Sequence, residues 1–318
     1  MKIFVTGAAG FIGFSLSLQL LKKNCLVYAI DNLDSYYSIR LKKERIKILK
    51  KYKNFKFKKI DISKRKQLYN YLKNKKFDFI YHFAAQAGVR YSIINPSKYI
   101  QSNLKGFKNL LFSTQKKDFK FLFYASSSSV YGDNKKFPLK ETFKLSPKNL
   151  YAKTKIQNEK DAKKFAIKYK KKLIGLRFFT VYGEWGRPDM LILKLLSSIK
   201  KKQIFGLNNK GDHYRDFTYI NDVVKILIGL IYKKKFKHNV YNICSSKPIY
   251  IKKAVNELLK ITNYKLIKNI KKNKLDVYKT YGDNTRIRKL LKMHKFTKFS
   301  IGLINTINWY KKTGIKFF

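Results

Sequence analysis

The chain opens with a short apolar run followed by three glycines, and this feature constrains the fold most strongly. Lys2 to Thr6 is typical of a strand, and Gly7, Gly10 and Gly13 follow it in the run KIFVTGAAGFIG. The first glycine permits a tight turn leaving the strand, and the second lets a pyrophosphate approach the backbone at a helix N-terminus. The third permits close packing of the helix on the sheet. The run therefore predicts a dinucleotide-binding strand–turn–helix unit.

The first 180 residues continue to alternate short β-branched or aromatic runs with longer amphipathic runs, the pattern of βα units around a parallel sheet. The predicted strands are Lys2 to Thr6, Leu26 to Ile30, Phe55 to Lys59, Phe79 to Phe83, Lys120 to Ala125 and Leu173 to Phe178. The predicted helices are Gly10 to Lys22, Arg40 to Lys51, Arg65 to Asn74, Pro96 to Gln115 and Leu150 to Lys170. We therefore expect an α/β fold with a Rossmann-type doubly wound parallel sheet over residues 1–180.

After residue 180 the alternation loosens. Short strands and the polar loop Asn208 to Tyr214 join helical patterns around Asp189 to Lys201, Asp222 to Lys233 and Ile251 to Lys260. We expect residues 181–318 to form a smaller, mixed α/β substrate lobe facing the ends of the sheet, with some segments returning to the first domain.

Asp31 ends the second predicted strand, 18 positions after Gly13. A carboxylate about 20 residues beyond such glycines accepts hydrogen bonds from the adenosine ribose. It would also repel a 2′-phosphate, and no arginine replaces or immediately follows it. The position favours NAD over NADP, although Asp31 taken alone could equally be a turn residue that caps a helix.

Tyr151 and Lys155 lie four positions apart in the run YAKTK and would share one face of a helix. We expect the ammonium to lower the pKa of the phenol from its reference of about 10, which would give a usable base near neutral pH. With 23 Tyr in the chain, the pattern is weak by itself. Its position supports it, because it follows the fifth predicted strand and the serine cluster Ser126 to Ser129, and open α/β sheets place their chemistry at the carboxyl ends of strands.

The composition is strongly basic: 73 Lys and Arg stand against 18 Asp and Glu, a net charge of +55. Such a charge is typical of proteins that bind nucleic acid or an anionic membrane. The lysines are spread through nearly every segment, however, and accompany many residues encoded by A/T-rich codons. We interpret the charge as a base-composition bias and expect no specific nucleic-acid partner. A nucleic-acid-binding protein is the alternative from a different class, and it leaves the glycine turn unexplained.

The remaining composition indicates a protein of the cytoplasm without a membrane segment. Cys25 and Cys244 are far apart, so we expect two free thiols in a reducing compartment, although counting leaves one disulfide open. Neither a signal-peptide pattern nor an uncharged apolar run of about 18 residues occurs. The four His residues lack metal-ligand spacing, and we expect no metal site.

Several motifs, in this order, resemble the extended short-chain dehydrogenase/reductase family of NAD-dependent nucleotide-sugar epimerases and dehydratases. They are TGAAGFIG with Asp31, HFAAQAG from His82, YASSSSVYG from Tyr124, YAKTK, and RDFTYIND from Arg215. The resemblance covers nearly the whole chain. Within the family, DNLDSYY, HFAAQAGVRYSIINP and LRFFTVYGEWGRPDM look most like UDP-glucuronate 4-epimerases.

The resemblance implies that the sugar is oxidised at C4 by transfer of a hydride to tightly bound NAD, and that the hydride returns on the other face. Tyr151 would take the hydroxyl proton, Lys155 would support the phenolate and bind the nicotinamide ribose, and Ser127 would hydrogen-bond the C4 oxygen. The residues implied to bind NAD are Gly7, Gly10, Phe11, Ile12, Gly13, Asp31, Asn32, Asp61, Ile62, Ala84, Ala85, Gln86, Tyr151 and Lys155.

The positions after Ser127 distinguish epimerases from their relatives. Dehydratases of this family carry an Asp–Glu pair there and related decarboxylases keep a Glu just before VYG, whereas this chain has Ser128 and Ser129. We interpret Tyr131, near these serines, as a packing residue rather than a base. The reaction expected is 4-epimerisation of a UDP-sugar, UDP-glucuronate to UDP-galacturonate. A UDP-glucose/galactose 4-epimerase or another UDP-sugar epimerase is the enzyme alternative.

The resemblance also implies substrate contacts at Arg90, Ser128, Thr180, Arg187, Arg215 and Asp276. Thr180 stands where UDP-galactose 4-epimerases have an Asn that contacts the hexose. Arg187, in GRPDM, offers the planar fork of donors that suits a carboxylate. Capping of the helix near Pro188, or pairing with Glu184, is the alternative for Arg187.

One position departs from the family. Asp276 follows Leu275, where members usually have Gly in a Pro-Gly-Asp that contacts the uridine ribose. If that turn requires positive φ, Leu275 would be strained. A family member that binds a nucleotide sugar without turning it over therefore stays open.

Family members usually pair two helices across a two-fold axis, here Pro96 to Gln115 and Leu150 to Lys170. An outward apolar stripe could come from Phe107, Leu111, Ile156 and Phe165, although the flanking lysines would repel one another. We expect a homodimer.

Overall fold

The computed structural model describes residues 1–264, 266–270 and 277–317. Its centre is a parallel sheet with the strand order β10-β6-β5-β4-β1-β2-β3. These strands are β1 (Lys2–Thr6), β2 (Leu26–Asp31), β3 (Phe55–Lys59), β4 (Phe79–His82), β5 (Phe121–Ser127), β6 (Leu173–Phe178) and β10 (Val240–Ile243). The order reverses between β1 and β4, which is where ligands bind in doubly wound sheets. The predicted fold class is confirmed.

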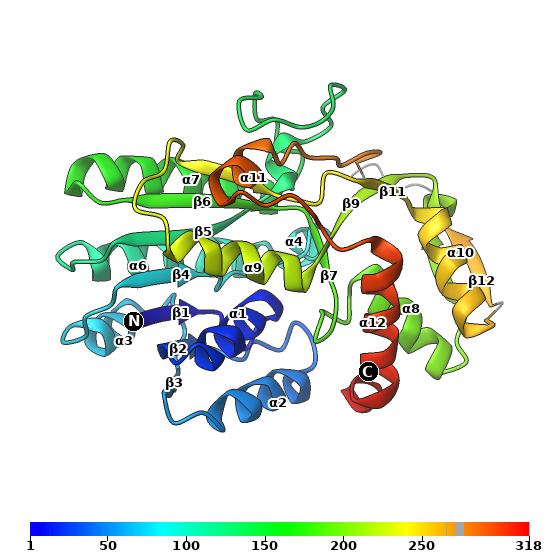
Figure 1. Ribbon diagram of the computed structural model, residues 1–318, viewed down its shortest axis with the longest axis horizontal. Coiled ribbons are helices and arrows are strands. Elements are labelled where there is room, and N and C mark those ends of the chain that lie inside the picture. The colour runs from blue at the N-terminus through cyan, green and yellow to red at the C-terminus, as the bar shows by residue number, and fades with distance from the viewer. Residues whose placement is uncertain (265, 271–276, 318) are drawn as a thin grey trace.

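Helices cover both faces of this sheet (Figure 1). One face packs against α1 (Phe11–Lys22), α2 (Ile39–Lys50) and α9 (Ile220–Ile231), and the other against α3 (Arg65–Leu72), α6 (Gly106–Thr114) and α7 (Leu150–Tyr169). Because neither face meets water, the strands are nearly continuous apolar runs, and every residue of β4 and β6 is buried.

The rest of the chain builds a smaller region at the carboxyl ends of the strands. A three-stranded sheet contains β7 (Thr180–Tyr182), β9 (Tyr214–Tyr219) and β11 (Pro248–Tyr250), and a two-stranded sheet pairs β8 (Phe205–Asn208) with β12 (Ile267–Ile270). Its helices are α8 (Leu191–Lys200), α10 (Ile251–Thr262), α11 (Thr285–Leu291) and α12 (Phe299–Lys312). Two elements from this half of the chain return to the large sheet: α9 packs on α1, and β10 pairs with β6. The division at residue 180 stays a prediction.

The predicted helix from Pro96 to Gln115 is not one regular helix. The chain forms α4 (Tyr91–Ile94), α5 (Pro96–Tyr99), the π-helical η1 (Ile100–Lys105) and then α6. Short 3₁₀ turns are η2 (Ser128–Tyr131), η3 (Asn209–Gly211) and η4 (Gly314–Phe317). The π-helical stretch widens the helix beside the sheet ends, and such bulges are frequent at functional sites.

The expected outward stripe on these helices is wrong. Phe107, Leu111 and Phe165 are buried against the sheet, and Ile156 packs on the cluster around Tyr131. These side chains therefore belong to the faces of the two helices that turn toward the core. Spacing alone cannot tell the core face of a helix from an outward apolar face.

Cys25 and Cys244 are buried free thiols, as expected. In the part of the chain that the structure describes, no helix combines the length and apolarity needed to cross a membrane. The same residues contain no group of three or more His, Cys, Asp or Glu side chains placed to hold a metal ion.

Candidate active site

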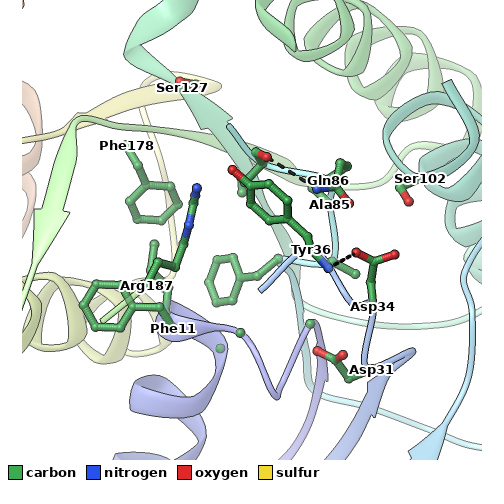
Figure 2. A pocket seen from close by; sticks show the side chains of 18 of the residues that line it. Phe11, Asp31, Asp34, Tyr36, Ala85, Gln86, Ser102, Ser127, Phe178 and Arg187 are labelled. Carbon is green, nitrogen blue, oxygen red and sulfur yellow. Dashed lines mark hydrogen bonds between the residues drawn. The ribbon is translucent and has the colours of Figure 1, made fainter. Parts of the chain in front are cut away.

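A cavity of about 260 Å³ lies at the carboxyl ends of β1, β4 and β5, where the strand order reverses (Figure 2). Most of the residues expected at the cofactor and at the catalytic centre line it: Gly7, Gly10, Phe11, Ile12, Gly13, Asp31, Asn32, Ile62, Ala84, Ala85, Gln86, Ser127, Tyr151, Lys155 and Arg187. Asp61, Arg90, Ser128, Thr180 and Arg215 lie outside its wall. Asp276 and Leu275 lie outside the described residues.

The glycine turn leaves no room for a side chain at Gly7 or Gly13. Gly7 has φ +73°, and a Cβ there would lie 2.6 Å from the backbone nitrogen of Ala84. A Cβ on Gly13 would lie 2.1 Å from the carbonyl oxygen of Gly7. Gly10 is the N-cap of α1, so the positive end of that helix faces the cavity. The turn is thus a backbone cradle suited to a pyrophosphate.

Asp31 closes the cradle from β2. Its carboxylate accepts hydrogen bonds from the backbone N–H groups of Ala9, at 3.0 Å, and Leu33, at 2.8 Å. Burial raises the pKa of Asp31, and these two hydrogen bonds oppose that effect. The expected ribose carboxylate therefore also fixes the glycine turn.

Asp61 acts behind the wall of the cavity. Its carboxylate accepts from the side-chain amide of Asn32 at 3.3 Å and from the backbone N–H of Ser63 at 2.8 Å. Burial alone would raise the pKa of Asp61, but the hydrogen bonds from Ser63 and Asn32 lower it below the usual value. Asp61 therefore positions Asn32, which lines the cavity.

The π-helical turn fixes the opposite wall. Asn103 pairs with both backbone groups of Gln86, accepting from its N–H at 2.8 Å and donating to its carbonyl at 3.1 Å. The same amide donates to the hydroxyl of Thr154 on α7 at 3.0 Å. The wall that carries Gln86 is thus tied directly to the helix that carries Tyr151.

The catalytic pair lies on the first turns of α7. Asn149 caps this helix by accepting from the N–H of Ala152 at 2.9 Å. Lys155 lies one turn beyond Tyr151, with its Nζ 5.9 Å from the centre of the phenol ring, and it donates to the carbonyl of Ala125 at 3.0 Å. The ammonium is thus anchored at the end of β5.

The expected lowering of the Tyr151 pKa is wrong for this structure. Burial raises that pKa, and a hydrogen bond with Ser127 and the positive charge of Arg187 only partly offset the effect. Burial also lowers the pKa of Lys155 to about 8, against the nearby charge of Glu159. The spacing of YAKTK reveals that the two groups are neighbours but not how deeply they are buried.

The serines at the end of β5 have different partners. Ser127 shares a hydrogen bond with Ser129, at 3.2 Å, in addition to its bond with Tyr151. Tyr131 is fully buried and donates to Asn242 at 2.6 Å. It does not line the cavity, so its interpretation as a packing residue is supported.

Arg187 reaches the cavity from the segment after β7. Figure 2 shows its side chain beside Phe178 and near Tyr36. It pairs with Asp189, at 3.0 and 2.5 Å, and not with Glu184, which accepts from Tyr219. Both alternatives weighed for Arg187, a helix cap and a Glu184 pair, missed this partner.

Other expected substrate residues lie farther out. Thr180 borders a small hollow next to the cavity, shared with Arg187 and Met190. Arg215, near the start of β9, donates to the carbonyl of Tyr214 at 2.7 Å. Arg90 is the N-cap residue of α4.

In the segment between β2 and α2, sequence reasoning assigned a role to Asn32 but to none of the residues after it. Asp34, Tyr36 and Tyr37 of this segment line the cavity, and so does Lys42 near the start of α2. Three side chains, those of Asp31, Asn32 and Asp34, each accept from the N–H two residues later. Repeated Asp and Asn in DNLDSYY are a recognisable signal for such turns, which would have shown an ordered segment at the cofactor site.

Arg45 was missed as well. It is fully buried on α2, although it is charged. Its guanidinium donates to the carbonyl of Ala9 at 2.7 Å, to that of Gly186 at 3.0 Å and to that of Trp185. It therefore joins the glycine turn to the segment that carries Arg187.

Taken together, a glycine cradle at a strand-order reversal, a carboxylate at the end of the second strand, and a Tyr–Lys pair with a serine define a dinucleotide-dependent enzyme. The sequence model of the NAD dependent epimerase/dehydratase family matches residues 3–244. The chain belongs to this family, and the resemblance stated from the motifs is confirmed.

Similar proteins agree across the full length. UDP-glucuronate 4-epimerase 5 of Arabidopsis thaliana is 36% identical over 330 residues, which cover 98% of this chain and 75% of that protein. The crystal structure of the UDP-glucuronic acid 4-epimerase of Bacillus cereus, in complex with UDP-glucuronic acid and NAD, is similar with a TM-score of 0.91, 29% identity and coverage of 98% and 99%. The UDP-glucose 4-epimerase of Thermotoga maritima, with UDP-glucose, gives a TM-score of 0.90, 27% identity and coverage of 98% and 99%.

The cofactor is NAD. The family is NAD dependent, and the residues present fit the dinucleotide, because the turn admits no Cβ at Gly7 or Gly13 and Asp31 stands at the end of β2. The enzyme is of the isomerase type.

Proposed function

We propose that the protein is a UDP-sugar 4-epimerase that converts UDP-glucuronate to UDP-galacturonate. The observation that carries this proposal is that Arg187 and Tyr151 line one cavity, and the charge of Arg187 acts on the Tyr151 phenol. A planar guanidinium is suited to a carboxylate, so a uronate sugar would meet its partner beside the base. The similarity to UDP-glucuronate 4-epimerases of Arabidopsis thaliana and Bacillus cereus supports this choice.

In the proposed reaction, Tyr151 takes the proton of the C4 hydroxyl and later returns it. Ser127 holds the C4 oxygen, since its hydroxyl already shares a hydrogen bond with the phenol. Lys155 contributes positive charge near the phenolate while its ammonium stays protonated, which its pKa of about 8 permits at neutral pH. When bound, NAD would supply a hydride acceptor and donor, and its positively charged ring would add to the charges of Arg187 and Lys155 that favour the Tyr151 phenolate against the effect of burial.

The two positions after Ser127 favour epimerisation over elimination. Ser128 and Ser129 occupy the positions at which dehydratases and decarboxylases of this family carry carboxylates, and neither serine can act as an acid of suitable pKa. The 4-keto sugar would therefore turn over and be reduced on its other face. No net oxidation results, and no added reductant is required.

The test uses the purified protein with UDP-glucuronate and no added cofactor. We expect an equilibrium mixture with UDP-galacturonate, separated by anion-exchange chromatography. An Arg187→Met variant should lose preference for the uronate while it keeps bound NAD. Absence of UDP-galacturonate, together with turnover of UDP-glucose, would overturn the uronate proposal.

A UDP-glucose/galactose 4-epimerase is the second candidate. The similarity to the Thermotoga maritima UDP-glucose 4-epimerase, nearly as close in structure as the uronate enzyme, favours it. Parallel assays with the two UDP-sugars decide between the candidates. Binding of both without turnover of either would instead indicate a family member that has lost catalysis.

We further propose a homodimer, paired through surfaces other than the stripe first expected. Exposed apolar side chains on the helices expected to pair, and on α4 just before them, include Ile93, Ile94, Ile100, Phe112 and Ile167, with Ile94 at 74% and Ile167 at 72% exposure. Contiguous exposed apolar patches are typical of interaction surfaces, and the proposed dimer would cover these side chains. Light scattering should report a dimer, and Ile94→Lys should shift it toward the monomer.

A further inference from the structure

The Arg187 guanidinium, which we propose binds the substrate carboxylate, is already paired with the carboxylate of Asp189. Asp189 accepts from Arg187 Nε at 3.0 Å and from Arg187 Nη2 at 2.5 Å, a two-pronged pair on one edge of the fork. The Arg187 side chain is 20% exposed, and Asp189 lies on the solvent side of it with 33% of its side chain exposed. The same edge cannot hold a second carboxylate in this geometry.

Tyr36 is a third member of this cluster. Its hydroxyl donates to Asp189 at 2.9 Å, and the Arg187 guanidinium lies 5.7 Å from the centre of its ring. Tyr36 comes from the segment after β2, whereas Arg187 and Asp189 come from the segment after β7. The Asp189 carboxylate therefore fastens two distant segments together beside the cavity that Tyr36 and Arg187 both line.

A row of packed tyrosine rings connects Tyr36 to Tyr151. Its ring packs on Tyr91 at 4.5 Å, Tyr91 on Tyr99 at 6.3 Å, and Tyr99 on Tyr151 at 6.1 Å between ring centres. Gly88 lies beneath the Tyr36 hydroxyl, where a Cβ would come within 2.4 Å. The ring is thus held by close packing, and Asp189 accepts from its hydroxyl.

The backbone of Arg187 is fixed independently of Asp189. Arg45 donates to the carbonyls of Trp185 and Gly186, immediately before Arg187. The Arg187 side chain can therefore change its partner while its main chain stays in place. A guanidinium buried without a carboxylate would be costly, so an internal partner is needed whenever no anionic sugar is present.

We propose that Asp189 is an internal competitor, which occupies the Arg187 fork until the carboxylate of a uronate sugar displaces it and releases Tyr36. This inference rests on the proposed uronate substrate and adds a specificity-determining residue to it. A neutral sugar offers no carboxylate and would leave the three side chains paired. Because of this competition, the apparent Kd for a uronate equals the intrinsic Kd divided by the fraction of molecules in which Arg187 is free of Asp189.

The test measures binding of UDP-glucuronate and UDP-glucose to the NAD-containing protein by calorimetry. Asp189→Asn keeps the size of the side chain but removes its charge, so Kd for UDP-glucuronate should fall by about fivefold. Tyr36→Phe removes one donor to Asp189 and should lower that Kd by a smaller factor. For both variants Kd for UDP-glucose should change by less than about twofold.

Asp118→Asn is the matched control, since Asp118 is fully exposed in a surface pair with Lys171 and has the same charge change. If Asp189→Asn and Tyr36→Phe leave the Kd for UDP-glucuronate unchanged or raise it, Asp189 orients Arg187 and the exchange is refuted. If wild-type protein binds UDP-glucose but not UDP-glucuronate, the proposed substrate itself is wrong. The two failures are therefore distinguishable.

Discussion

Glu159 and Arg177 form a buried, two-pronged ion pair behind the catalytic helix. Arg177 Nε donates to Glu159 Oε1 at 2.9 Å and Nη2 donates to Oε2 at 2.7 Å. The Glu159 side chain is 10% exposed and the Arg177 side chain 5%. Ser126 donates to the same carboxylate at 2.6 Å. The pair thus joins α7, which carries Tyr151, to the ends of β5 and β6.

Removing one member of this pair should destabilise the protein strongly. Glu159→Ala leaves the Arg177 guanidinium buried without its carboxylate, and such changes cost about 3 kcal/mol. Urea unfolding of this variant, compared with the surface variant Asp118→Ala, measures the loss. A free energy of unfolding within about 0.5 kcal/mol of wild type would show that the pair does not hold α7 in place.

Tyr151→Phe should abolish turnover without loss of the cofactor. The phenol is buried and hydrogen-bonded with Ser127, and losing a general base costs about 10³-fold in kcat. The matched control is Tyr131→Phe, because Tyr131 is also buried near the serines but does not line the cavity. It should lose stability and keep its activity. Retained activity in Tyr151→Phe would refute the assigned base.

The pKa of Lys155, lowered by burial to about 8 against the charge of Glu159, predicts an alkaline limit to activity. Raising the pH through 8 discharges the ammonium, so kcat should fall there. His82, the other titratable group coupled to Lys155, has its pKa lowered by burial to about 3 and stays neutral across this range.

The stability effect of Lys155 has the opposite sign. Its pKa is about 8 when folded and 10.5 when unfolded, so between these values the unfolded chain binds more protons. The contribution of Lys155 to the free energy of unfolding therefore rises with pH in that window. Denaturant titrations of wild type and Lys155→Met at several pH values isolate this contribution. For the activity prediction, a kcat that does not fall between pH 8 and pH 10.5 would contradict the lowered pKa of Lys155.

Gly13→Ala should empty the cradle. Its added Cβ would lie 2.1 Å from the carbonyl oxygen of Gly7, so the turn must open. Gly229→Ala, in α9, is the control, because its Cβ meets only the flexible Leu291 side chain at 3.1 Å. We expect NAD to copurify with Gly229→Ala and not with Gly13→Ala, as measured by the absorbance of the released dinucleotide. Equal NAD content in the two would show that the turn tolerates a side chain.

The fold was largely accessible from sequence because its strands are buried on both faces. The strands Lys2–Thr6, Phe55–Lys59 and Leu173–Phe178 have the predicted bounds, since each is a short apolar or aromatic run between polar segments. The region from Pro96 to Gln115 was harder. Its apolar spacing indicates a helix, but the widened turn at Ile100–Lys105 depends on tertiary bonds of Asn103.

The site was accessible only where chemistry follows a motif. The glycine turn and Asp31 line the cavity as expected, because strand ends and a helix N-terminus fix them locally. Tyr36 and Asp189 were not found, because they are 153 positions apart and meet only through the fold. The direction of the Tyr151 pKa was wrong because it depends on burial, which four-residue spacing does not report.

The most direct test of the central claim follows one hydrogen atom. UDP-glucuronate carrying deuterium at C4 is incubated with the protein in ordinary water, and the product is examined by mass spectrometry and NMR. If the hydrogen leaves and returns as a hydride held within the site, UDP-galacturonate retains the deuterium at C4. Product in which water hydrogen has replaced the deuterium would contradict the account.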